Sequence, residues 1–120
     1  MSAPWSITNT SGSGAAGTAS LSQPTNAAAQ GQQIRVRSVT ATLAGSGAGS
    51  DTFQIKDGST VVYAAQLSIA ANGYAQLSLT NTDIRISGTL TVAFASGVAN
   101  DVECVNAQGD FVQTGAPYGV

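Results

Sequence analysis

The chain has 120 residues, of which ten are charged, one is cysteine and none is histidine, and its net charge is −2. Because catalytic sites are built mostly from histidine, carboxylate, lysine and cysteine side chains, this composition argues against an enzyme. The four basic residues are too few for the basic patch that nucleic-acid binding needs, and no apolar run approaches the about 18–20 residues that span a membrane.

The first 31 residues are predicted to form a flexible N-terminal arm. Residues 11–20 contain only Ser, Gly, Ala and Thr, and such a stretch buries too little apolar surface to offset its ordering entropy. Trp5 and Ile7 precede this stretch in a short β-prone segment. The sequence leaves two interpretations open: an arm that docks on a partner, or a terminus that packs on its own domain.

Residues 32–120 are predicted to form one β-domain, and its first strand carries a change of apolar phase. Ile34 and Val36 share one phase, and the next apolar residue, Val39, lies in the other. Because strand side chains alternate between two faces, a shift of one residue predicts a β-bulge or a strand that passes between sheets.

Two dipeptides predict tight hairpin turns further along the domain, Asp57-Gly58 and Asn72-Gly73. Short segments of alternating apolar residues follow, separated by turns, and no helical stripe persists over three turns. Many short strands at this spacing predict an all-β fold, an antiparallel β-sandwich of jelly-roll-like type with the N-terminal arm attached.

A pair of acidic residues near the end of the chain is a candidate for a metal site. Asp101 and Glu103 lie on the same face of a predicted strand. Other oxygen ligands nearby are Asn100, Asn106 and Asp110. The spacing matches no calcium-binding loop, and acidic residues in such a place are usually solvated, so we expect no metal and no cofactor.

The single cysteine, Cys104, cannot form an intrachain disulfide and is expected to face the core. The residues after Met1 lack the basic and apolar regions of a signal peptide. Both observations indicate synthesis in a reducing cytosol.

The candidate interface residues are apolar and aromatic positions near the two ends of the chain and three arginines. Arginine is enriched at protein interfaces, although each arginine here could equally be a surface solubiliser. The candidates are Trp5, Ile7, Arg35, Arg37, Arg85 and Tyr118. No catalytic residue is assigned.

Three segments carry a resemblance to a known family: residues 35–45 (RVRSVTATLAG), 53–63 (FQIKDGSTVVY) and 72–79 (NGYAQLSL). Over about residues 32–95 the chain resembles the small β-sandwich proteins of tailed bacteriophages, in particular capsid decoration (cement) proteins. The resemblance implies a homotrimer on the virion surface, made in the host cytoplasm, that binds between major capsid protein subunits and stabilises the head. It brings no catalytic residues.

Two other functions remain alternatives. One is a tail, head-fibre or baseplate accessory protein of a phage. The other is a carbohydrate-binding or host-adhesion module that uses Tyr63, Tyr74 or Trp5. A hydrolase is remote, since Asp101 and Glu103 would be its only carboxylate pair.

Overall fold

A computed structural model describes residues 3–23 and 31–113, and these residues form nine strands and no helix. The strands are β1 (Ala3–Thr10), β2 (Thr18–Leu21), β3 (Gln32–Gly45), β4 (Gly49–Asp57), β5 (Thr60–Ile69), β6 (Gly73–Leu79), β7 (Ile84–Ile86), β8 (Leu90–Phe94) and β9 (Asp101–Gln113). Within these ranges there is accordingly no helix that could cross a membrane.

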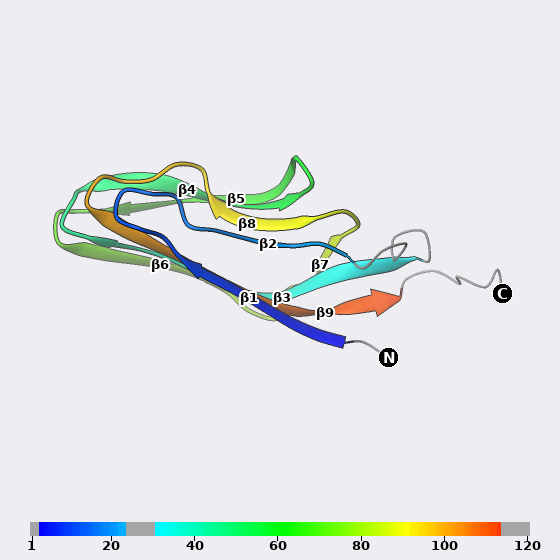
Figure 1. Cartoon of the computed structure of the whole chain (residues 1–120). Helices are drawn as coiled ribbons and strands as arrows, with labels where there is room; N and C mark the ends of the chain where they lie inside the picture. The colour runs from blue at the N-terminus through cyan, green and yellow to red at the C-terminus, as the bar shows by residue number, and fades with distance from the viewer. Residues whose placement is uncertain (1–2, 24–30, 114–120) are drawn as a thin grey trace.

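The strands form two antiparallel sheets that pack face to face (Figure 1). Sheet A has the order β1-β9-β3-β6, with β7 also pairing with β3, and sheet B has the order β2-β8-β4-β5. The pairs are nested along the chain: β4 with β5, β3 with β6, β2 with β8 and β1 with β9. A long hairpin rolled up in this way is a jelly roll, so the predicted fold class is confirmed.

The change of apolar phase in β3 is a β-bulge. The register between β3 and β9 shifts between Val36 and Ser38, so Arg37 is the extra residue. Both Val36 and Val39 therefore face the interior, where they are buried. The bulge alternative is confirmed, because all of β3 remains in sheet A.

The core lies between the two sheets and is built from aliphatic residues, two phenylalanines and Trp5. Phe53 of β4 and Phe94 of β8 meet edge to face, with ring centroids 5.7 Å apart. Leu43 and Val105 of sheet A are completely buried opposite sheet B. Burying each such side chain contributes about 1.5–3 kcal/mol, so this layer supplies the main stabilisation.

The expectation of a flexible arm does not hold for residues 3–23. β1 pairs with β9 along its whole length, and β2 pairs with β8. Trp5 and Ala19 belong to the core cluster, which explains why this segment packs on its own domain. Residues 24–30 of the predicted arm lie outside the described residues.

One of the two predicted hairpins is confirmed and the other is wrong. β4 and β5 pair on either side of the turn at Gly58, which has φ +61°. Asn72, with φ +59°, also lies in a turn, but β5 belongs to sheet B and β6 to sheet A. A turn dipeptide fixes where the chain reverses, whereas the pairing partner of the returning strand depends on distant strands.

Candidate interaction site on the outer face of sheet A

A groove of about 890 Å³ crosses the outer face of sheet A at the bulge. Its lining comes from β1, β3, β9 and the turn after β6, and includes Pro4, Ser6, Arg37, Asn81, Gln108 and Asp110. Because the bulge inserts one residue between two inward-facing valines, Arg37 and Ser38 both face outward here. The groove is therefore mixed in character, with Pro4 and Trp5 beside hydroxyls, amides and one exposed guanidinium.

A row of charged side chains runs beside the groove across three strands. Arg35 of β3 lies opposite Asp110 of β9 and opposite Arg85 of β7. The Arg35 guanidinium donates two hydrogen bonds to Asp110, from Nε to Oδ1 at 2.8 Å and from Nη2 to Oδ2 at 2.7 Å. This bidentate pairing raises the pKa of Arg35 above its ordinary value, so the guanidinium stays charged.

Arg37 is held much less tightly than Arg35. Its Nη1 atom lies 4.0 Å from Oδ2 of Asp110, and its side chain is 51% exposed. Since Asp110 already accepts two hydrogen bonds from Arg35, the Arg37 guanidinium retains donors directed to solvent.

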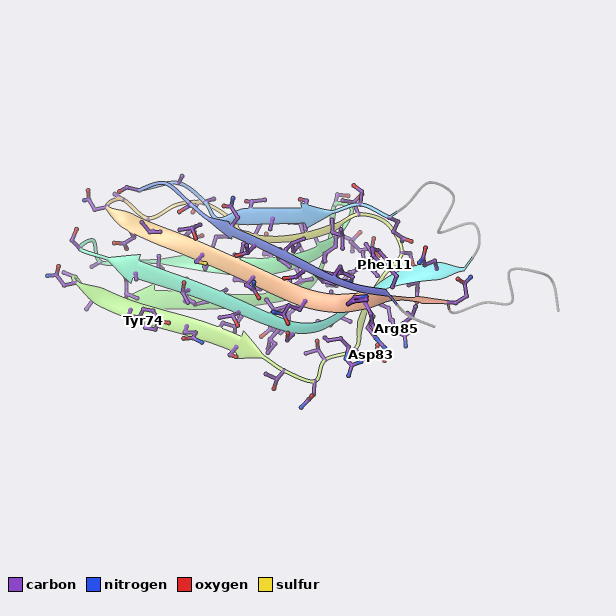
Figure 2. The ribbon with its side chains drawn as sticks, turned by 60° about the horizontal axis from the view of Figure 1, so that its bottom comes forward. Tyr74, Asp83, Arg85 and Phe111 are labelled. Atoms are coloured by element: carbon purple, nitrogen blue, oxygen red, sulfur yellow. The ribbon has the colours of Figure 1, made fainter. Side chains whose placement is uncertain are left out.

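Arg85 forms a second ion pair in the same region. Its Nε atom donates to Oδ1 of Asp83 at 2.6 Å, and this hydrogen bond lowers the pKa of Asp83. Figure 2 shows the two side chains together near the end of the sheet that holds Phe111. We call Arg35, Arg37, Arg85, Asp83 and Asp110 the charged cluster. It contains three of the four basic residues and carries a formal charge of +1.

The structure thus brings the three predicted interface arginines together, but it corrects the apolar candidates. Trp5 is only 9% exposed and faces the core, and Ile7 is half-buried against the same core. Both side chains stabilise the fold and are not free to anchor a partner. Tyr118 lies outside the described residues.

Three carboxyl groups lie buried between the sheets at one end of the sandwich. Asp101 and Glu103 are 0% exposed, and Asp51 of β4 is 4% exposed. The expectation that the acidic pair is solvated is therefore wrong. Asn106 and Asp110 alternate with the buried positions of β9 and face outward, so the oxygen ligands considered above do not converge. Within residues 3–23 and 31–113, no group of three acidic, histidine or cysteine side chains could hold a metal ion.

Each buried carboxyl group uses one oxygen to accept hydrogen bonds from protein donors. Oδ1 of Asp51 accepts from the Ser96 amide at 3.1 Å, Oδ1 of Asp101 from the Gly47 amide at 2.8 Å, and Oε1 of Glu103 from the Gly17 amide at 3.0 Å. The second oxygen of each group has no donor among the described residues. The three groups therefore tie sheet and loop segments together but remain incompletely satisfied.

Glu103 is the buried carboxyl group that holds a proton. Burial raises its pKa to about 8, and a hydrogen bond to Asp51 and the charges of Asp51 and Asp101 act in the same direction. At neutral pH Glu103 is consequently protonated, so its carboxyl group can supply toward Asp51 a donor that the ionised groups lack.

The inward position of Glu103 places Cys104 on the outer face of β9, where Thr10 Oγ1 lies 3.5 Å from Sγ. The expectation that Cys104 faces the core is thus wrong. The sequence did hold a signal, because Val105 and Ala107 continue the phase of Glu103 and are fully buried. An apolar continuation outweighs the polarity of the two acidic residues in fixing the face of a strand.

No protein-family model and no curated protein matches the sequence. Among solved structures, the coat protein of Tobacco streak virus is similar at 9% identity and a TM-score of 0.39, covering 93% of this chain and 87% of that one. TmCBM61, solved with β-1,4-galactotriose, is similar at 11% identity and a TM-score of 0.39, covering 93% and 70%. The capsid protein of BFDV is similar at 7% identity and a TM-score of 0.36, covering 92% and 98%. These similarities assign no chemistry to the present chain.

Proposed function

We propose that this protein is a non-enzymatic structural protein of a virion, a capsid decoration protein that attaches to a phage head between major capsid protein subunits. The observation that carries the proposal is the charged cluster beside the groove of sheet A. Of the other charged residues, three are buried, and Lys56 and Asp57 lie together at the β4–β5 hairpin. An otherwise uncharged exterior therefore presents one face suited to an ionic contact.

Arg37 is the residue best placed to make that contact. Its planar guanidinium has donors directed outward and is matched to the two oxygens of a carboxylate. The neighbouring hydroxyls and amides of the groove add neutral hydrogen-bonding groups around it. We propose that acidic side chains of the shell bind there.

The change of Arg37 to Ala is expected to weaken binding to undecorated shells by about tenfold or more, as is usual for an arginine at the centre of an interface. Lys56→Ala removes the same charge from the β4–β5 hairpin and is the matched control, which should bind like the unchanged protein. Sedimentation of labelled protein with shells at a series of concentrations measures both. Equal affinities of the two variants would show that the cluster is not the contact.

The homotrimer that the resemblance implies stays a prediction, as do the virion location and the synthesis in host cytoplasm. A role on the tail or baseplate is the nearest alternative. Electron micrographs of virions labelled with an antibody to the protein separate the two, since the label falls on either the head or the tail.

Carbohydrate binding is a second candidate, favoured by Tyr74. This side chain is 62% exposed on β6, with its hydroxyl donating to Oε1 of Gln76 at 2.5 Å. Figure 2 shows it toward the opposite end of the molecule from Asp83 and Arg85. If it stacks on a sugar, a glycan array should give hits that Tyr74→Ala abolishes and Arg37→Ala preserves. An array without hits would remove this candidate.

A further inference from the structure

The two sides of the sandwich differ in how their edge strands are protected. On one side, β1 carries Pro4, which has no backbone N–H to offer, and β2 has only four residues. On the other side, β5 has ten residues and β6 has seven, and neither contains proline or a charged residue. Natural sheets blunt exposed edges with short strands, proline or charge, and the β5–β6 side lacks all three.

The same side of the sandwich is incompletely closed. The inward-facing residues of β5 and β6 are mostly half-buried, whereas those of β3 from Val36 to Leu43 are buried completely. The inward-facing residues concerned are Tyr63, Ile69, Ala75, Leu77 and Leu79. Val61 and Val62 are exposed beside them. Apolar surface thus borders both open edges.

Among the described strands, β5 pairs only with β4. Alternate N–H and C=O groups of β5 therefore point away from sheet B, as on any edge of an antiparallel ladder. A bulge at Val62 interrupts the start of the strand, where Ile55 pairs with Tyr63 and Lys56 with Val61. Residues 63–69 then continue in regular register with β4. This regular stretch is long enough to bind another strand.

We propose that β5 pairs antiparallel with β5 of a second copy of this chain, across a two-fold axis near Gln66. This dimer is the expected state of the free protein, whereas the homotrimer that the resemblance implies is predicted for the virion surface, so the two are separate predictions. Gln66 is the centre of residues 63–69, and a two-fold axis there sets Gln66 opposite itself and Ala64 opposite Ser68. Nε2 of Gln66 donates to Oγ of Ser50 at 3.3 Å, which leaves its second N–H and its Oε1 for the glutamine of the other copy.

The absence of charge along this edge favours a second copy of the chain as its binding partner. A two-fold contact always places identical residues close together, so a charged residue at its centre would repel the same residue of the other copy. The chain has no charged residue from 58 to 82, although ten occur elsewhere. A copy of the same edge also supplies the matching strand length and the matching apolar border.

The test compares Gln66→Lys with Gln54→Lys. Gln54 lies on the central strand β4 and is half-exposed, whereas Gln66 is exposed, so the second variant adds the same charge to the same sheet away from its edge. Light scattering coupled to size exclusion, over a concentration series of the full chain, gives the mass. We expect twice 11.9 kDa for the unchanged protein and for Gln54→Lys, and a single chain for Gln66→Lys.

Amide hydrogen exchange provides the second measurement. Dimer formation should slow exchange in residues 63–69 by at least tenfold, and Gln66→Lys should restore fast exchange while circular dichroism stays that of the folded protein. A monomer at all concentrations, a trimer of the free protein, or a dimer unaffected by Gln66→Lys would overturn the proposal. Slow exchange in monomeric Gln66→Lys would also overturn it, by showing that the chain covers this edge itself.

Discussion

The free energy of unfolding is expected to fall by up to about 4 kcal/mol as the pH rises from 4.5 to about 8, because Glu103 must keep its proton in the folded state. The pKa of Glu103 is near 4.5 in the unfolded chain and about 8 in the fold. The folded state therefore binds more protons in this range, and stability decreases with pH. The contribution is complete below pH 4.5 and is lost as the pH passes through 8.

Glu103→Gln isolates this effect. The glutamine amide can donate to Asp51, and its oxygen can accept from the Gly17 amide, which is the arrangement of the protonated acid. The variant should therefore lose the pH dependence and be more stable than the unchanged protein at pH 9. Urea denaturation between pH 4.5 and 9 measures both profiles.

Asp83→Asn is the control for Glu103→Gln, since Asp83 is a surface carboxyl group whose pKa is lowered by Arg85. It should leave the fall between pH 4.5 and 8 unchanged. A Glu103→Gln profile that still falls over this range would assign the proton to another group.

Trp5→Ala is expected to destabilise the protein by about 3 kcal/mol, a typical cost for removing a large buried aromatic side chain. The indole packs across Gly109 of β9, and a Cβ at that position would lie 2.8 Å from the ring. Loss of the ring leaves a cavity between β1 and the core and frees the N-terminal strand to separate. Thermal unfolding, followed by circular dichroism, measures the lower Tm.

Trp5→Phe keeps an aromatic ring in this space and should lose clearly less stability than Trp5→Ala. If Trp5 were an anchor for a partner, the Tm of Trp5→Ala would be unchanged and only shell binding would be lost. That result would contradict the buried position of the side chain.

The elements that the sequence predicts correctly are those set by local chemistry. The bulge in β3 follows because the apolar residues before and after it differ in phase, yet all of them must face the core. The turn at Gly58 follows from a backbone conformation that glycine adopts readily. The crossing from β5 to β6 has no such local signal. It depends on Leu79 reaching Val39 of β3, forty positions earlier in the chain.

The candidate site was predictable only in part for the same reason. The scarcity of arginine marked Arg35 and Arg85 as candidates, yet their proximity depends on β7 pairing with β3, which no spacing reveals. Asp51 carried no signal at all. Its burial beside Glu103 requires the two sheets to be stacked, and that arrangement is a property of the whole fold.

The nested order of the strands has a consequence for synthesis of the protein. β9 supplies the hydrogen-bonding partner of both β1 and β3, and Thr10 pairs with Cys104, so sheet A joins the two extremes of the described chain. Until a ribosome has made β9, β1 has no strand to pair with, and β3 lacks one of its neighbours. Folding can be completed only after β9 has emerged, and its pairing with β1 joins residues far apart in the sequence. Such long-range pairing places the protein among the slow, millisecond-to-second, all-β folders. During that interval the uncharged strands depend on dilution or on chaperones to avoid pairing with one another.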